Sequence, residues 1–265
     1  MAANNIVTLT TDFGVSDHFV GTMRGVILGV NLQANVVDLC NSVNPFDVLD
    51  AALTLAQAYS YYPPDTTHVV VVDPGVGSAR RPLLVTTTRH YFLAPDNGVL
   101  SLVMDQEERV LVRHITSEHY FLQPISQTFH GRDVFAPCAG WLSKGVEPAK
   151  FGEEITDYQR FSLPRPKPTG ERALKGVILK TDRFGNLITN LTPANAPAIF
   201  AAGAELRITV GAATVSGLQA SYAEGKPGEP FAILNSMGYL EIAANRGSAA
   251  QLAKAGRGTE VTVEW

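Results

Sequence analysis

The stretch THVVVVD, residues 67–73, constrains the fold of this chain more than any other. Four consecutive valines leave no polar face, which is typical of a strand that is buried on both sides in a parallel sheet. Residues 5–11 and 35–40 predict two more strands, and apolar residues at helical spacing separate the three over 19–30 and 45–61. This β-α-β-α-β order predicts a mostly parallel sheet flanked by helices.

Local signals suggest where these helices begin and end. Asp17 is placed to cap the first helix, and Pro45 with Asp47 opens the second, which we expect to run to about Tyr61. Farther along, the pattern predicts two antiparallel strands, a short helix, another strand, and a helix from near Asp133 to Gly145, with Pro137 in its first turn or at a kink.

A composition change divides the chain. Three prolines lie within residues 164–168, and beyond them short β-like runs alternate with Gly, Pro and Asn. We therefore expect an N-terminal α/β domain over residues 1–163, a proline-rich linker over 164–173, and a smaller C-terminal all-β barrel-like domain over 174–265.

Bulk composition narrows the class of protein. The 265 residues are 45% hydrophobic and 17% charged, and the net charge of −4 argues against nucleic acid as a partner. No apolar run is long enough to span a bilayer and no secretory signal is recognisable, so we expect a cytoplasmic protein without a membrane partner. Cys40 and Cys138 lie in apolar surroundings, which favours buried free thiols over a disulfide.

Two acids follow strands that we expect to be parallel. Asp12 comes after the first strand and Asp73 after the third, and ligands of such sheets bind beyond the carboxyl ends of the strands. Asp12 could accept hydrogen bonds from the hydroxyls of a ribose, or it could simply cap the turn into the next helix.

The loop DPGVGSARR, residues 73–81, is not a phosphate cradle. It lacks the third glycine of a dinucleotide fingerprint and leads into a strand where that motif requires a helix. A turn between two strands instead brings Asp73 within ion-pair reach of Arg80. The sequence alone favours a structural salt bridge here, with a functional pair as the alternative.

Further polar side chains occur in predicted loops. His130 lies in TFHGRD, where its ring could face a pocket or simply be solvated, and no histidine, cysteine or acid spacing predicts a metal site. In TDRFGNLITN, residues 181–190, the aromatic ring and the amides could bind a purine, or they could form an ordinary polar barrel loop.

Seven segments taken in order carry a resemblance to a known family. They are TTDFG, NPFDV, VVDPGVGSARR, APDNG, TFHGRD, TDRFGNLITN and NSMGYLEIAANRGSAA. Together they span nearly the whole chain, which resembles the S-adenosyl-L-methionine hydroxide adenosyltransferases, the adenosine-forming hydrolases related to the bacterial fluorinase and chlorinase.

This resemblance implies a homotrimer in which S-adenosyl-L-methionine lies between one subunit's N-terminal domain and its neighbour's C-terminal domain. It also implies binding roles for individual residues. Those residues are Asp12 for the ribose hydroxyls, Phe46 and Phe129 for the pocket wall, Asp182 for the amino group, Phe184 and Asn186 for the adenine, Ser236 for the carboxylate, and Asn245 and Arg246 for the adenine edge.

Within the family, an Asp-Arg-His set marks the enzymes that use water. The chain carries it as Asp73, Arg80 and His130, whereas the halide users have a tyrosine in place of Asp73 and a tyrosine-serine pair at His130-Gly131. Met237 departs from the arginine that follows the Ser236 position in the halogenases, so carboxylate binding can differ here.

The resemblance thus implies hydrolysis of S-adenosyl-L-methionine to adenosine and methionine by in-line attack of water on the ribose C5′. The leaving group is a neutral thioether, so we expect neither a metal nor a cofactor, and either Asp73 or His130 could be the base. Two alternatives stay open: a halide-dependent adenosyltransferase, and a protein that binds the nucleoside without catalysis.

Overall fold

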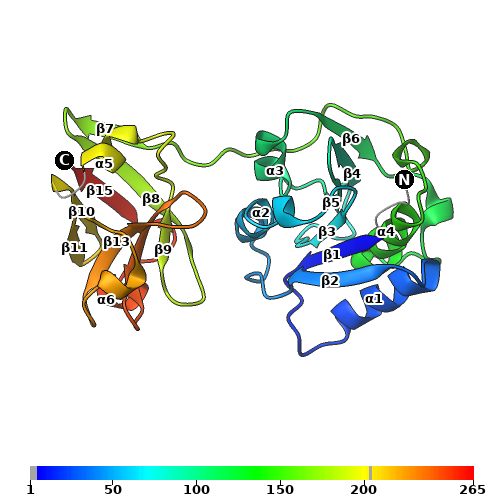
Figure 1. Cartoon of the computed structure of the whole chain (residues 1–265). Helices are drawn as coiled ribbons and strands as arrows, with labels where there is room; N and C mark the ends of the chain where they lie inside the picture. Colours follow the sequence, from blue (N-terminus) through cyan, green and yellow to red (C-terminus); the bar gives the residue numbers. More distant parts are fainter. Residues whose placement is uncertain (1–4, 203–204) are drawn as a thin grey trace. The chain divides into compact units, whose positions relative to one another are not determined.

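The computed structural model describes residues 5–202 and 205–265, and the chain divides into two compact units, residues 1–162 and 163–265. The N-terminal unit is built on a six-stranded sheet in the order β2-β1-β3-β5-β4-β6 (Figure 1). Its strands are β1 (Ile6–Thr11), β2 (Asn35–Cys40), β3 (Thr67–Val71), β4 (Pro82–Thr87), β5 (Tyr91–Pro95) and β6 (Val110–His114).

The sheet is mostly parallel, as the sequence predicts. Strands β2, β1, β3 and β5 run parallel to one another, whereas β4 runs antiparallel to both β5 and β6. Every residue of β3 is buried, which confirms the central strand expected from the four valines.

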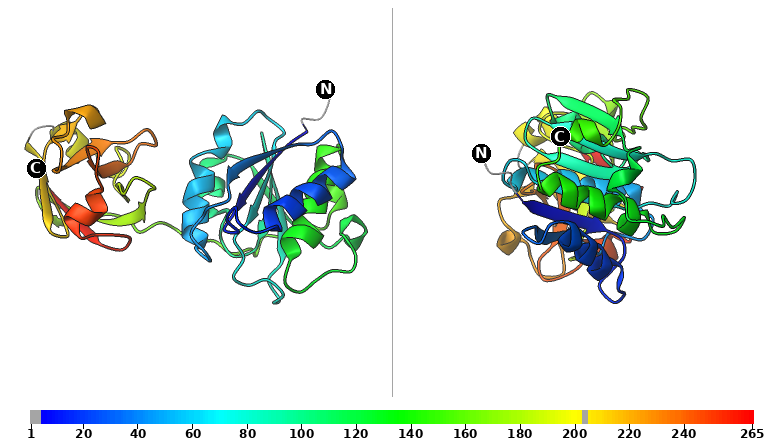
Figure 2. Two further views of the ribbon diagram at one scale, coloured as in Figure 1. Left: turned by 90° about the horizontal axis from the view of Figure 1, so that it is seen from below. Right: turned by 90° about the vertical axis from the view of Figure 1, so that its right-hand side faces the viewer.

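Helices cover both faces of this sheet. Figure 2 shows α1 and α4 on one face and α2 on the other. The helices are α1 (Phe19–Val30), α2 (Val48–Ala56), α3 (Ser101–Gln106) and α4 (Ala136–Ser143), with shorter turns at η1 (Tyr59–Tyr61), η2 (Glu118–Tyr120), η3 (Gly131–Phe135) and η4 (Pro148–Lys150). Among the described helices none is both long and apolar enough to cross a membrane.

Three details of the helices differ from the sequence expectations. Helix α1 starts after His18 without any side-chain cap, so the prediction that Asp17 caps it is wrong. Asp47 does cap α2, but that helix ends at Ala56 and only a 3₁₀ turn reaches Tyr61.

The helix expected from Asp133 begins with a wide π turn that precedes α4. Pro137 has no N–H to donate to the carbonyl of Asp133 four residues earlier, and the backbone N–H of Leu122 donates to that carbonyl instead, over 2.8 Å. A proline in the first turn of α4 thus accounts for the irregular start of this helix, and His130 lies immediately before it.

The C-terminal unit is a nearly closed, barrel-like sheet in the order β11-β10-β15-β8-β9-β14-β13-β12, with β7 also paired to β8. Apolar side chains of these strands, such as Ile178, Leu187 and Ile242, form its core. The strands are β7 (Lys167–Gly170), β8 (Ala173–Thr181), β9 (Leu187–Thr189), β10 (Arg207–Val210), β11 (Ala213–Ser216), β12 (Leu218–Gln219), β13 (Pro230–Leu234), β14 (Leu240–Ala244) and β15 (Glu260–Glu264).

Short helical segments accompany these strands: α5 (Pro197–Ala202), α6 (Ala249–Ala253) and η6 (Tyr222–Glu224). The segment expected as a linker also contributes structure, because β7 lies within residues 164–173 and Pro168 is paired with Leu174. A proline is tolerated there because β7 is an exposed edge strand, where the missing N–H leaves no neighbouring strand unpaired.

Candidate active site

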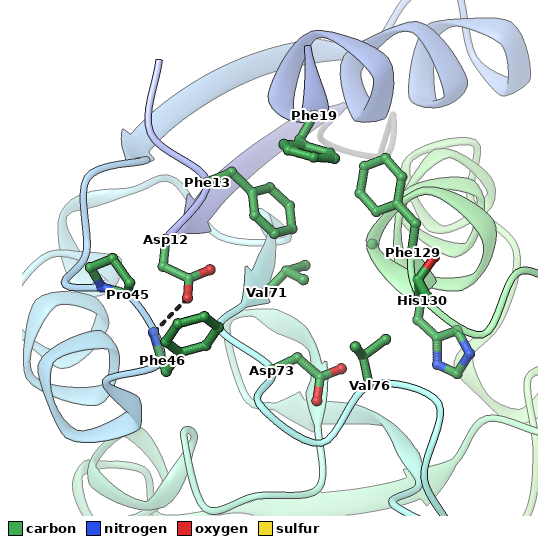
Figure 3. A pocket seen from close by; sticks show the side chains of 12 residues that line it. Asp12, Phe13, Phe19, Pro45, Phe46, Val71, Asp73, Val76, Phe129 and His130 are labelled. Carbon is green, nitrogen blue, oxygen red and sulfur yellow. Dashed lines mark hydrogen bonds between the residues drawn. The ribbon is translucent and has the colours of Figure 1, made fainter. Parts of the chain in front are cut away.

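A cavity of about 290 Å³ opens beyond the carboxyl ends of β1 and β3, where their order in the sheet predicts a ligand site (Figure 3). It is lined by Asp12, Phe13, Phe19, Pro45, Phe46, Val71, Asp73, Val76, Thr128, Phe129, His130 and Gly131. Five residues predicted from the sequence therefore lie around one cavity, although they come from four separate segments of the chain.

Asp12 faces the cavity, and its structural role differs from the expected cap of the turn into the next helix, because its carboxylate bonds to the loop before α2 instead. Its Oδ2 accepts a hydrogen bond from the backbone N–H of Phe46 over 2.8 Å (Figure 3). Phe46 has a φ of 64°, a left-handed conformation that is costly for an aromatic residue. Asp12 thus holds a strained turn whose phenylalanine side chain is 73% exposed.

Phe129 belongs to an aromatic wall that the sequence only partly predicts. Its ring packs edge-to-face on Phe13 and Phe19, with centroids 5.8 and 5.3 Å apart. Phe13 directly follows Asp12 in TTDFG, and Phe19 belongs to the apolar pattern of α1. The pattern signalled Phe19 only as a core residue, because periodicity does not tell a cavity wall from a helix interface.

Asp73, Arg80 and His130 form one hydrogen-bonded cluster. Arg80 Nε donates to Asp73 Oδ1 over 3.0 Å, and Arg80 Nη2 donates to Asp73 Oδ2 and, over 2.8 Å, to His130 Nδ1. The side chains of Asp73 and Arg80 are only 5% and 7% exposed. A bidentate ion pair that is shielded from water in this way holds its geometry far better than a surface pair.

The partner of His130 fixes the hydrogen on its ring. A guanidinium group only donates, so Nδ1 must accept and the hydrogen of the neutral ring lies on Nε2. Burial, together with the positive charge of Arg80, lowers the pKa of His130 below its ordinary value, while Asp73 opposes that shift. The imidazole is therefore neutral at neutral pH, with an N–H donor on its remaining nitrogen.

Arg80 lies behind the other two members of the cluster. Asp73 and His130 line the cavity, but Arg80 is not among its described lining residues. The guanidinium carbon lies 5.5 Å from the centre of the Phe135 ring, and Nη1 has no hydrogen-bond partner among the described residues. Arg80 thus orients the two groups that face the cavity.

The loop that carries Asp73 and Arg80 fits closely against the segment before His130. Gly77 has a φ of 77°, and a Cβ at this position would lie 2.3 Å from the carbonyl oxygen of Gln127. Only glycine fits both the conformation and the close approach. The sequence showed the glycines but not the neighbour that requires one of them.

The C-terminal unit has a second cavity, of about 550 Å³, at the carboxyl end of β14. It is lined by Asp182, Phe184, Asn186, Tyr222, Ala244, Asn245, Arg246 and Gly247. Phe184 is 78% exposed, and Tyr222 is a second aromatic side chain that the sequence interpretation missed. Five predicted residues line this cavity, whereas Ser236 is exposed on the turn after β13 and is not among the described lining residues.

Asp182 is occupied by its own loop. Its carboxylate accepts hydrogen bonds from the backbone N–H of Phe184 and of Asn186 over 2.9 and 2.8 Å, and from the Asn186 side chain over 2.9 Å. These bonds explain the compact TDRFGN turn and leave Asn186 Oδ1 as the free end of that amide. The side-chain amide of Asn245 likewise donates to the carbonyl of Gly225 over 2.7 Å.

A buried carboxylate holds Tyr222 through a hydrogen bond to its hydroxyl. Glu241 on β14 accepts a hydrogen bond from the Tyr222 hydroxyl over 2.8 Å and another from Asn235 over 3.0 Å. Burial raises the pKa of Glu241, and burial together with the Glu241 hydrogen bond raises the pKa of Tyr222 to about 12. The tyrosine ring is thereby held by its hydroxyl while part of the ring stays exposed.

Comparison with known proteins identifies two family domains. Residues 7–152 match the SAM hydroxide adenosyltransferase N-terminal domain and residues 176–262 match the corresponding C-terminal domain, where SAM is S-adenosyl-L-methionine.

Among curated relatives, an (R)-S-adenosyl-L-methionine hydrolase of Thermus thermophilus is 34% identical, covering 92% of this chain and 93% of the relative. A Salinispora arenicola hydrolase of the same name is 32% identical over 99% of both chains. A fluorinase of an Actinoplanes species is more distant, at 24% identity over 98% of this chain and 97% of that protein. The crystal structure of an uncharacterised conserved protein from Thermotoga maritima superposes with a TM-score of 0.90 at 32% identity, covering 98% of this chain and all of that one.

Proposed function

The chain belongs to the SAM hydroxide adenosyltransferase family, and on this premise we propose that it hydrolyses S-adenosyl-L-methionine to adenosine and L-methionine. Its curated relatives are named for the (R) form of this sulfonium, and we extend the same epimer to this chain. The observation that carries the proposal is the cluster of Asp73, Arg80 and His130 at the edge of a cavity of about 290 Å³.

The chemistry requires a weak nucleophile to be aligned and deprotonated. A water oxygen forms a bond to the ribose C5′ while the C5′–S bond breaks, and the electron pair of that bond stays on sulfur as the neutral thioether of methionine. One water proton goes to a base of the protein. Holding the water opposite the breaking bond can remove roughly 7–11 kcal/mol of the barrier in well-oriented systems.

The hydrogen-bond pattern supports different roles for Asp73 and His130, either of which could be the base on the sequence alone. Nδ1 of His130 is occupied by Arg80 and Nε2 carries a hydrogen, so the ring offers the water a donor. Asp73 retains lone pairs beyond those used by Arg80, so it is the acceptor for the proton. A water that donates to Asp73 and accepts from His130 directs its remaining lone pair toward C5′.

The binding roles expected for the other residues support a cationic nucleoside substrate. In this proposal Asp12 binds the ribose hydroxyls, Phe46 and Phe129 exclude bulk water, and Phe184 with Asn186 binds the adenine. The further contacts are Asp182 to the amino group, Ser236 to the carboxylate, and Asn245 and Arg246 to the adenine edge. Asp182 already accepts three hydrogen bonds, so it would bind the amino group through the carboxylate lone pairs that these bonds do not use.

Three further properties belong to the proposal. A homotrimer, in which a neighbour's C-terminal unit completes each site, follows from the family resemblance, and light scattering on the purified protein tests it. Independence of metals and cofactors follows from a leaving group that needs neither a proton nor a Lewis acid. A cytoplasmic location fits the unpaired Cys40 and Cys138, and cell fractionation tests that location.

Product analysis distinguishes this function from its rivals. Purified protein is incubated with the separated (R) and (S) epimers, with and without added chloride or fluoride, and the products are resolved by chromatography. We expect adenosine and methionine, faster from the (R) epimer and unaffected by halide. Formation of 5′-halo-adenosine would identify a halide adenosyltransferase, and binding without any product would identify a non-catalytic binder.

A further inference from the structure

The APDNG turn, residues 94–98, lies against both ends of the loop that carries Asp73 and Arg80. Strand β5 runs parallel to β3 and antiparallel to β4. Its carboxyl end therefore lies beside the end of β3, where the loop begins, and beside the start of β4, where the loop ends. No other turn of this sheet is placed by the strand order next to both points among the described residues.

Asn97 holds the beginning of the loop. Its side-chain Nδ2 donates to the carbonyl of Val72 over 2.9 Å, and its Oδ1 accepts from the backbone N–H of Val99 over 3.1 Å. The Val72 carbonyl belongs to the peptide that leads into Asp73. With both ends of its amide engaged, Asn97 fixes the plane of that peptide and so the direction in which the Asp73 side chain leaves the backbone.

Asp96 holds the end of the same loop. Arg81 donates from Nε and Nη2 to Asp96 Oδ2 over 3.0 and 2.8 Å, and the backbone N–H of Asp96 donates to the Arg81 carbonyl over 2.8 Å. The Asp96 side chain is 4% exposed, and its Oδ1 also accepts from the backbone N–H of Gln159 over 2.7 Å. Arg81 directly follows Arg80, so this partly buried pair fixes the backbone from which the Arg80 side chain extends.

We propose that Asn97 is a positioning residue for the proposed hydrolysis: it holds Asp73 in register with Arg80 and His130 while Asp96 secures the other end of the loop. Asn97 is not among the described lining residues of the cavity, so it acts through the backbone of Val72 and does not touch substrate. The inference rests on the proposed function for its effect on turnover, and on geometry alone for its effect on the cluster.

The test compares Asn97→Ala and Asn97→Asp with a matched control, Asn31→Ala. Asn31 has the same bonding pattern in the same unit: its Nδ2 donates to Ser143 Oγ over 2.9 Å, and its Oδ1 accepts from the N–H two residues on, over 3.1 Å. It joins α1 to α4 away from the cavity. Loss of an equivalent hydrogen bond is thus compared with and without contact to the loop.

Two readouts are measured on the full chain. We expect kcat for adenosine formation to fall by about 100-fold in both Asn97 variants, with KM changed by less than about threefold, because a small misplacement of catalytic groups has effects of this size. The ring nitrogens of His130, followed by ¹⁵N NMR and assigned with His130→Gln, should titrate closer to the ordinary histidine value. In Asn97→Asp an acceptor faces the Val72 carbonyl, so this variant should show the larger changes.

Asn31→Ala should keep the wild-type kcat and the wild-type titration of His130, even if its melting temperature falls as much as that of the Asn97 variants. Equal losses of kcat in the Asn31 and Asn97 variants, or an unchanged His130 titration in Asn97→Asp, would overturn the inference. If the wild type forms no adenosine, the proposed function fails, while the His130 titration still decides whether Asn97 holds the cluster.

Discussion

The two cavities of this chain differ in charge: each exposes an aromatic ring, Phe46 in one and Phe184 in the other, but the N-terminal cavity is also bordered by a buried ion pair. In the N-terminal unit the polar groups are already bonded to one another: the Asp73–Arg80 pair is nearly buried, and His130 accepts from the same guanidinium. In the C-terminal unit Phe184, which we propose to stack on the adenine, is 78% exposed. Charged groups stabilise a transition state best when they are already held in position before the reaction. A stacking surface has only to be accessible to the base.

Under the proposed function, this contrast predicts that the N-terminal unit governs turnover and that the C-terminal unit contributes affinity. A preformed cluster lowers the barrier without contributing much to ground-state binding, and an exposed ring contributes binding energy without participating in chemistry. Substitutions in the two units should therefore separate kcat from KM.

The largest effect should come from Asp73→Asn. The variant keeps the shape of the side chain but loses the carboxylate that we propose takes the water proton, so kcat should fall by about 10²–10⁴-fold with little change in substrate affinity. Steady-state kinetics and calorimetric binding measure the two quantities. Asp38→Asn is the matched control, because Asp38 pairs with Arg24 on the exposed surface of the same unit. A large rise in Kd with unchanged kcat would reverse the assignment.

Phe184→Ala should have the next largest effect, and in the other parameter. Stacking of a base on an aromatic side chain contributes roughly 1–3 kcal/mol, so KM should rise by about tenfold or more while kcat changes little. Tyr61→Ala removes a similarly exposed ring, 76% accessible, from the N-terminal unit and should leave both parameters unchanged. Loss of kcat at constant KM in the Phe184 variant would contradict the division between the units.

Stability should respond to pH in opposite directions in the two units. His68 is buried beside His90, with ring centroids 5.1 Å apart, and burial followed by His90 lowers the pKa of His68 to about 3. Below about pH 6.5 the unfolded chain binds a proton that folded His68 does not. The N-terminal unit should therefore lose about 2 kcal/mol between pH 7 and pH 5 through this residue.

Glu241 has the opposite sign in the C-terminal unit. Burial raises its pKa, so its contribution to stability is full below the ordinary carboxyl pKa and is lost as the pH rises through the raised pKa.

Trp141 lies in one unit and Trp265 in the other, and they are the only tryptophans of the chain. Urea unfolding of Trp265→Phe and Trp141→Phe variants thus reports each unit separately. His68→Gln should flatten the pH response of the N-terminal unit, and a response of equal sign in both units would contradict this account.

The smallest expected effect is that of a chelator. Departure of a neutral thioether requires no Lewis acid, so dialysis against EDTA should leave kcat and KM within experimental error. Activity that disappears with EDTA and returns with a divalent metal would show that the cluster of Asp73, Arg80 and His130 is insufficient.

The sequence predicts the parts of this site that follow from regular patterns. Alternating strands and helices place Asp12 and Asp73 at one edge of a sheet, and a turn between two strands brings Arg80 back to Asp73. The sequence does not predict that Arg80 lies behind the cavity, because a pairing in sequence does not show which partner faces a ligand.

Other features leave no pattern to find. The ring hydrogen of His130 depends on a partner fifty residues away, and Tyr222 lines a cavity only because the barrel brings its loop beside Phe184. The π turn before α4 similarly requires knowing that Leu122 occupies the carbonyl that Pro137 leaves free. Such features follow from tertiary contacts, which a pattern along the chain does not record.

Asn97 is followed by Gly98, and this is the only asparagine–glycine pair in the sequence. In a mobile peptide such a pair readily loses ammonia, because the unhindered nitrogen of the glycine attacks the side-chain amide. The bonds to Val72 and Val99 slow this reaction by fixing the amide, so the folded protein protects the asparagine that orients its own loop. Molecules that unfold transiently should deamidate at Asn97 and lose activity during storage. Peptide mass mapping of stored samples would detect the deamidated residue.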